Sequence, residues 1–400
     1  MAGERIITTP LIIDVETTTE NNGNPYDPNN KLCLVGFRHN GDNHIFDVEY
    51  IQKPIAETIE KINLYLDTIA NLFDTIVSFN SKFDLAWLRQ YDIRIPADGK
   101  TFWDCQLAHF IHTNQSVVYP SLDKCCEYYG IPGKLDVVDR EYWSKGIDTP
   151  EIPLEVLMPY LETDLEITEK LFQRQLETIS KSKSNLIKLH NQDLLVLLDM
   201  ECNGIRFDFR GMEDRLRATQ SELQEVESRL NEYSQWEYFN WDSGDHLSCL
   251  LYGGTITVDV PHAYEHTYKA GAKAGQTATR YRWETVTKTY PRLIEPLPKS
   301  ELKKEGYWSV DSSVLRQLKP RTKPHRRLLE LIQKRSELSK LIDTYLIGLP
   351  KKYKAMNWED DLMHGKFNQV VARTGRLSSS DPNLQNLDPI IHEYIISRYS

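Results

Sequence analysis

The chain of 400 residues contains no long apolar run, and this absence excludes one broad class of proteins. No stretch reaches the roughly 18 consecutive apolar residues that a membrane-spanning helix requires. The first ten residues, MAGERIITTP, contain no apolar segment of the kind found in secretory signal peptides. The sequence therefore predicts an intracellular protein without a membrane span.

Cysteine is also scarce, and its spacing excludes two further kinds of site. The six cysteines are Cys33, Cys105, Cys125, Cys126, Cys202 and Cys249. Their spacing matches neither a zinc site nor a disulfide framework. We therefore expect reduced, buried thiols, as in other intracellular proteins. No internal repeat is visible.

Charge is distributed unevenly along the chain, whose formal net charge is -10. Residues 1–178 hold 15 Lys and Arg against 29 Asp and Glu, whereas residues 179–400 hold 33 against 29. The acidic half would repel a polyanion unless metal ions intervened, and the basic half suits one. An acidic surface is also common in proteins simply because it keeps them soluble, and this is the alternative explanation.

Residues 11–18, LIIDVETT, place two carboxylates at the end of an apolar run. Side chains alternate between the faces of a strand, so Asp14 and Glu16 should point the same way. Two acids on one face repel each other, and a divalent cation removes that repulsion. Alone, the pattern is weak evidence and is more typical of a solvated strand end.

The first half alternates between strand and helix patterns. Strands are expected at 11–15, 31–39, 44–48, 76–79 and 102–105, and helices at 54–72, 81–91 and 154–178. This order predicts one α/β domain. Asp84 follows the strand at 76–79, while Tyr160 and Asp164 lie one turn apart on the last helix. An ordinary first-turn acid and a packing tyrosine are the alternative interpretations.

Taken in order, the three motifs D-x-E, N-x-K-F-D and Y-x-x-x-D resemble those of the DEDDy class of 3′–5′ exonucleases. The resemblance implies a ribonuclease H-like fold in which four carboxylates hold two divalent metal ions and a tyrosine positions the attacking water. The implied metal ligands are Asp14, Glu16, Asp84 and Asp164, with Tyr160 orienting the water and Asn80 contacting the substrate strand. One departure is Glu20, where family members often have an apolar residue against the terminal bases.

Phosphodiester hydrolysis explains why such residues are needed. Two metals about 3.5–4 Å apart can hold the attacking hydroxide and the leaving oxygen together. Oxygen ligands suit Mg²⁺ or Mn²⁺, and no His and Cys set points to zinc.

The second half predicts a mainly helical region after a polar boundary at 179–185. Helices are expected near 186–200, 212–233 and 325–347. Between them, residues 254–306 mix Gly, Thr and aromatics and predict a β-ribbon. Residues 261–304 contain nine Lys and Arg and four Glu. Basic residues among aromatics suit either nucleic-acid binding or docking of a replisome or processivity protein.

Residues 373–388, RTGRLSSSDPNLQNLD, closely resemble the start of the palm of family A DNA polymerases. MECNGIRFD, LSCLLYGGTI and ELSKLIDTYLIGLP resemble thumb segments of that family, and the phage members are most similar. A phage protein would act in the infected host cell. The resemblance implies that Arg376, Gln385 and Asn386 contact the minor groove of primer–template DNA, whose acceptors are common to all base pairs.

These resemblances predict three regions: an exonuclease domain at 1–180, a thumb-like region at 185–355 carrying the insertion at 254–306, and the beginning of a palm at 356–400. The family's later polymerase motifs are not present in the sequence. We therefore expect no polymerase activity from this chain by itself, and a separate C-terminal half bearing palm and fingers. A truncated gene is the other explanation.

The leading hypothesis is a proofreading 3′–5′ exonuclease that removes nucleoside monophosphates from single-stranded or frayed DNA. One alternative is a primer–template clamp with an idle nuclease site. Another is an RNase D-like RNA exonuclease with the same carboxylates, against which the T-G-R-L-S-S stretch argues.

Overall fold

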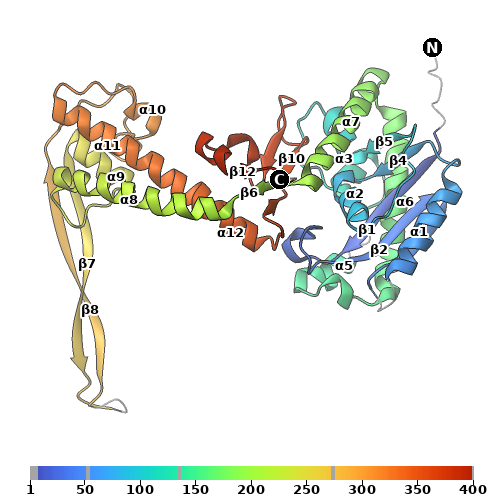
Figure 1. Ribbon diagram of the computed structural model, residues 1–400, viewed down its shortest axis with the longest axis horizontal. Helices are drawn as coiled ribbons and strands as arrows, with labels where there is room; N and C mark the ends of the chain where they lie inside the picture. The colour runs from blue at the N-terminus through green and yellow to red at the C-terminus, as the bar shows by residue number, and fades with distance from the viewer. Residues whose placement is uncertain (1–7, 51–54, 134–136, 272–274, 399–400) are drawn as a thin grey trace. The chain divides into compact units, whose positions relative to one another are not determined.

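The computed structural model describes residues 8–50, 55–133, 137–271 and 275–398 and groups the chain into two compact units. The first unit combines Met1–Phe209 with Leu349–Ser400, and the second is Arg210–Gly348 (Figure 1). The second unit is thus one continuous segment between two parts of the first.

The first unit is built on a five-stranded sheet with the order β3-β2-β1-β4-β5. Its strands are β1 (Pro10–Thr17), β2 (Leu32–His39), β3 (Asp42–Asp47), β4 (Thr75–Ser78) and β5 (Thr101–Asp104). The central strand β1 is antiparallel to β2 and parallel to β4. The carboxyl ends of β1 and β4 therefore lie side by side, at the edge where the predicted site residues begin.

Helices cover both faces of this sheet (Figure 1). The main helices are α1 (Ile55–Ile69), α2 (Ser81–Gln90), α3 (Cys105–His112), α6 (Leu154–Thr178) and α7 (Lys181–Asn203). Ile13 of β1 packs in one buried cluster with Leu66 of α1. Ile12, on the other face of the strand, packs in a second cluster with Leu161 of α6. The predicted α/β arrangement of this half is confirmed, with element ends shifted by a few residues.

Shorter elements connect these helices and strands. They are η1 (Glu20–Asn22), α4 (Leu122–Tyr129), α5 (Val137–Glu141), η2 (Trp143–Lys145) and η3 (Thr149–Glu151).

The first unit continues past the polar stretch at 179–185, which lies at the junction of α6 and α7. Ile187 and Leu194 of α7 are buried in the same cluster as α6. Asn191 of α7 accepts a 2.8 Å hydrogen bond from the backbone N–H of Asp104. Helix α7 therefore belongs structurally with the sheet, and the functional division at residue 180 stays a prediction.

The C-terminal segment, 349–398, completes the first unit with two small sheets. Strand β6 (Ile205–Phe207) lies between β12 (Ile395–Ile396) and β9 (Leu362–Met363), antiparallel to both. The remaining elements are α12 (Gly348–Ala355), β10 (Lys366–Asn368) paired with β11 (Ser378–Ser380), η5 (Leu384–Asn386) and η6 (Pro389–Tyr394).

The second unit is helical apart from one long ribbon. Its helices are α8 (Phe209–Ser234), α9 (Gly244–Tyr252), α10 (Ser312–Leu315) and α11 (Lys323–Lys340), followed by η4 (Leu341–Ile347). Strands β7 (Gly254–Thr267) and β8 (Thr277–Tyr290) form the predicted ribbon. Leu230, Leu251 and Leu328 lie in the core that joins α8, α9 and α11.

The last predicted helix of this unit differs from expectation over η4, where the helix widens to π-helical geometry. A Cβ on Gly348 would lie 2.8 Å from the carbonyl oxygen of Asp343, five residues earlier. Only glycine fits so close to that carbonyl, and the wider turn ends there.

All six cysteines are free, and five of them are buried, with Cys202 partly exposed. Burial raises the pKa of the Cys33 thiol to about 12. Among the residues that the structure describes, no helix is both long and apolar enough to cross a membrane.

Candidate metal centre

Strand β1 carries the first two predicted ligands at its carboxyl end. Asp14 and Glu16 alternate with the buried Ile13 and Val15, so they share the face of Ile12, which packs toward α6. The register of β1 against β2 shifts between Glu16 and Thr17. This irregularity ends the regular pairing at the point where the carboxylates are presented.

Helix α6 brings two further residues to this face because β2 lets it approach closely. Gly36 lies opposite Asp14 in the β1–β2 ladder. A Cβ at this position would lie 2.8 Å from Leu165 Cδ1 and 3.1 Å from Leu161 Cγ. These two leucines flank Asp164 in sequence, so the glycine sets how near Asp164 lies to β1.

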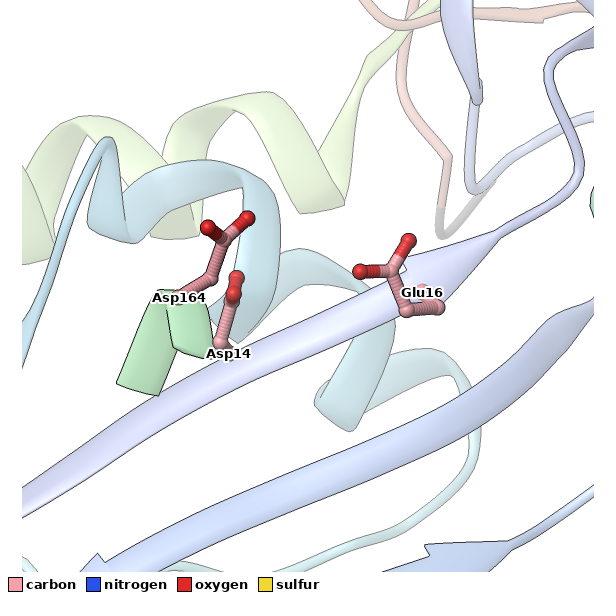
Figure 2. Close-up of side chains that lie close together, drawn as sticks. All are labelled: Asp14, Glu16 and Asp164. Atoms are coloured by element: carbon pink, nitrogen blue, oxygen red, sulfur yellow. The ribbon is translucent and has the colours of Figure 1, made fainter. Parts of the chain in front are cut away.

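Asp14, Glu16 and Asp164 converge at one place. Each offers a carboxylate oxygen, and these three oxygens all lie within 4.8 Å of one another. Figure 2 shows Asp14 and Glu16 rising from the same side of β1 beside Asp164. Among the described residues this is the one group of three or more His, Cys, Asp or Glu side chains so placed. Carboxylate oxygens brought this close together have the donor chemistry that a divalent cation uses.

Tyr160 lies beside this group, one turn before Asp164 on α6. Its side chain is 2% exposed. Burial raises the pKa of the phenol, and the charges of Asp164, Glu16 and Asp14 and a hydrogen bond with Asp164 raise it further. The ring of Trp143 meets it edge-on, with centroids 5.6 Å apart. Tyr160 is therefore held as a neutral hydrogen-bond donor.

Asp84 lies in the first turn of α2, directly after β4. It is fully buried, and its Oδ2 has no hydrogen-bond partner among the described residues. Burial raises its pKa well above the usual range, and the charges of Asp14 and Asp104 raise it further. Asp84 is not part of the group within 4.8 Å, although the charge of Asp14 reaches it. A buried carboxylate oxygen without a hydrogen-bond partner is a donor that a cation could use.

Asp104, at the end of the neighbouring strand β5, supports the start of α2, the helix that carries Asp84. Its carboxylate accepts hydrogen bonds from the backbone N–H groups of Gln106 and Leu107 at the start of α3. Its other oxygen accepts a 2.8 Å hydrogen bond from the backbone N–H of Ser81, the first residue of α2. Sequence reasoning did not single out this residue, although an Asp between a strand and a helix is a typical N-cap.

Asp14, Glu16 and Asp164 line a groove of about 420 Å³ together with Tyr160, the residues after β1 and two further aromatic side chains. These two are Phe83 and Trp143. Trp143 donates a 3.1 Å hydrogen bond to Thr149, whose hydroxyl donates a 2.6 Å hydrogen bond to the carbonyl of Thr17. Neither aromatic residue was predicted as a site residue, although Phe83 lies inside the second motif.

Asn80 lies outside this groove. It is exposed in a left-handed conformation with φ of 64° at the start of α2. It lines a neighbouring cavity of about 140 Å³ with Lys82 and with Lys366 of the C-terminal segment. Phe83 lines both spaces, so the two are adjacent. Glu20, in η1, is exposed and lines neither.

Arg376, Gln385 and Asn386 are exposed in the C-terminal segment and are not part of the carboxylate group. Gln385 and Asn386 belong to η5, and the side chain of Asn383 accepts a 3.2 Å hydrogen bond from the backbone N–H of Gln385. Their predicted contacts stay predictions.

Comparison with known proteins gives one family match. The model of the family described as DNA polymerase family A matches residues 286–396. The DNA polymerase I of Chloroflexus aurantiacus is 29% identical over 248 residues, which are 61% of this chain and 22% of that protein. The DNA polymerase I of Synechocystis sp. is 27% identical over 315 residues, 77% of this chain and 26% of the other. The chain thus spans about a quarter of the length of these relatives.

A solved structure is similar over nearly the whole chain. It is described as the POL domain of Pol1 from M. smegmatis in complex with DNA primer-template and dNTP. The TM-score is 0.61 at 16% identity, covering 96% of this chain and 53% of the other. The fold of the chain is therefore a mixed α/β fold similar to that polymerase domain, and the chain contains a region related to family A DNA polymerases.

Proposed function

Because the chain contains a region related to family A DNA polymerases, we propose that its first unit is a metal-dependent 3′–5′ exonuclease acting on DNA. In this proposal the sheet β3-β2-β1-β4-β5 with its helices is a ribonuclease H-like DEDDy domain. The reaction is hydrolysis of the 3′-terminal phosphodiester, with release of a nucleoside monophosphate. Proofreading during DNA replication is its role.

One observation carries the proposal: three carboxylates from β1 and α6 meet beside a buried tyrosine. Three carboxylates approach one another there within 4.8 Å. Such an arrangement costs stability unless a cation is bound, so it supports a catalytic role rather than a structural one.

The side chains present fit divalent cations. Every donor is a carboxylate oxygen, which suits Mg²⁺ or Mn²⁺ rather than zinc. Asp14, Glu16, Asp84 and Asp164 would hold them, and the partnerless Oδ2 of Asp84 supports its inclusion. Two such ions, when bound, stabilise negative charge on the attacking and leaving oxygens.

The surrounding residues have separate tasks in this proposal. The neutral phenol of Tyr160 orients the attacking water by a hydrogen bond, without itself acting as the base. Phe83 and Trp143 form apolar walls against which the terminal nucleotide lies. Asn80 contacts the substrate strand from the adjacent cavity.

The C-terminal segment extends the proposal to primer–template DNA. Arg376, Gln385 and Asn386 are exposed, as residues that contact a minor groove must be. Nucleotide addition is assigned to no described residue of this chain, and a separate polymerase half stays a prediction.

The proposal is tested by following digestion of a 5′-labelled single-stranded DNA with Mg²⁺ or Mn²⁺. Wild-type protein should shorten the strand from its 3′ end, and EDTA should stop the reaction. The Asp14→Asn/Glu16→Gln variant should be inactive. Glu162→Gln, a change of another carboxylate on α6 outside the group, is the matched control and should keep the wild-type rate.

Two other outcomes would contradict the proposal, and each would favour a different function. Faster digestion of an RNA strand of the same sequence would indicate an RNA exonuclease. A folded wild-type protein that binds primer–template DNA but digests no strand would indicate a clamp with an idle site.

A further inference from the structure

Beyond its base, the ribbon of β7 and β8 has both faces exposed to solvent in the described structure. The strands pair along 14 positions, from Gly254 opposite Tyr290 to Thr267 opposite Thr277. Such strands are about 45 Å long. Ile256 and Tyr290 anchor the base of the ribbon in the core, but no described residue from 257 to 289 is buried. A two-stranded ribbon with both faces in solvent is marginally stable, which favours a ligand that covers it.

The register assigns the side chains of the outer half to two faces. Pro261 lies opposite Trp283, and Ala263 opposite Tyr281, so these four share one face. The other face carries the pairs His262 with Arg282 and Tyr264 with Arg280. The sequence of β8 therefore alternates cation and aromatic ring, R-Y-R-W, over 280–283.

The aromatic face is open to solvent. The side chains of Trp283 and Tyr281 are 65% and 62% exposed. Residues two apart on a strand are separated by about 6.6–6.8 Å. This separation is close to twice the roughly 3.4 Å spacing of stacked bases. The remainder of this face of β8 consists of the small polar residues Thr277, Thr279, Thr285, Thr287 and Thr289.

The second face of the ribbon carries two arginines, Arg280 and Arg282, that can bind an anionic ligand. Arg282 makes no hydrogen bond or ion pair with any described residue, whereas Arg280 lies over the ring of Tyr268 at 5.2 Å. Glu284 contacts His262 at 3.3 Å. A two-stranded ribbon is narrow, so a flexible chain that stacks on one face can reach arginines at the edge of the other.

We propose that this ribbon binds single-stranded DNA, with unpaired bases stacked on Tyr281 and Trp283 and phosphates neutralised by Arg280 and Arg282. Exposed aromatic side chains interleaved with cations are the usual features of surfaces that hold single strands without reading sequence. The adjacent arginines favour this ligand over an apolar protein surface. The inference goes beyond the nuclease activity and does not rest on it.

The test measures binding of the 400-residue chain to a small circular single-stranded DNA in EDTA, by fluorescence anisotropy. A circle has no 3′ end, so the carboxylate groove cannot digest it or hold a terminus. The Tyr281→Ala/Trp283→Ala variant should bind at least about fivefold more weakly, because each stacked base contributes measurably. Arg280→Gln/Arg282→Gln should also weaken binding and lower the slope of log affinity against log salt by about 0.7 for each cation.

Two controls make the result specific. Thr287→Ala changes an exposed residue of the same face nearer the base and should leave the affinity unchanged. Trp283→Phe keeps a ring and should restore most of the affinity lost with Trp283→Ala. If the double aromatic variant binds the circle within twofold of wild type, the proposal is wrong. A protein would then be the expected ligand of this face.

Discussion

The phenol of Tyr160 is hydrogen-bonded to Asp164, the residue one turn further along α6. This bond joins the buried tyrosine to the carboxylate group, and the edge contact with Trp143 fixes the ring. Tyr160→Phe keeps the ring and removes only the hydroxyl. We expect digestion of single-stranded DNA to slow by about 100-fold. The urea unfolding midpoint should stay near that of wild type, and an unchanged rate would exclude the positioning role.

Asp84 should destabilise the protein in the absence of metal. Its raised pKa shows that the folded state favours the neutral carboxyl, so ionisation at neutral pH costs stability. In EDTA, we expect Asp84→Asn to raise the free energy of unfolding by about 1–3 kcal/mol. Added Mn²⁺ should stabilise wild type more than the variant. Unfolding curves with and without Mn²⁺ measure both effects, and equal stabilisation by Mn²⁺ would remove Asp84 from the ligand set.

The ion pair of Lys82 with Glu201 joins α2 to α7 in a largely buried position. The atoms lie 2.5 Å apart, and both Lys82 and Glu201 also bond the backbone of Phe367. Lys82→Met should lower the free energy of unfolding by about 3 kcal/mol, because Glu201 is left buried without its cation.

A second pair between the same helices is a matched control for this prediction. Arg89 and Asp199 also join α2 to α7, but both side chains are largely exposed. Arg89→Met should therefore cost less than about 1 kcal/mol. Equal losses for the two variants would show that burial does not decide the contribution of these pairs.

His109 should make the first unit less stable at low pH. Burial, with a contribution from His112, lowers its pKa to about 4, and the rings of Tyr128 and Tyr129 pack against it. A lowered histidine pKa means that the unfolded chain takes up the proton first, so stability falls as the pH drops from about 6.5 toward 4. Between pH 7.5 and 5 the loss should be about 2 kcal/mol. His109→Phe keeps an aromatic ring and should remove this part of the pH dependence, as measured by urea unfolding.

Gly36 should be needed for the spacing of β1 and α6. An added methyl group meets Leu165 and Leu161, so Gly36→Ala should cost about 1–3 kcal/mol. It should also slow digestion, because Asp164 and Tyr160 move with α6. Gly133→Ala adds the same methyl group in open space and should change neither property.

The sequence was most informative where one local pattern decides the structure. Alternation in a strand placed Asp14 and Glu16 on one face, and the helical period placed Tyr160 one turn from Asp164. Their meeting in space depends on the close approach at Gly36, which involves leucines far away in the sequence. The supporting role of Asp104 likewise depends on the pairing of β4 with β5. These long-range contacts have no local signal.

The polar stretch at 179–185 shows the opposite difficulty. Its composition is typical of a linker, but buried side chains of α7 return the chain to the sheet of the first unit. The polar composition of this stretch indicates only that the stretch itself is exposed. The buried face of the following helix, α7, decides which core the chain joins.

The small sheet of the first unit has a consequence for the order in which the protein folds during synthesis. Strand β6 leaves the ribosome before the whole second unit, but both of its neighbours, β9 and β12, are translated after it. The backbone groups of β6 that these neighbours satisfy must remain hydrated throughout that interval. The five-stranded sheet with α7 can assemble early, whereas the part of the first unit that contains β6 closes only after translation has passed residue 396.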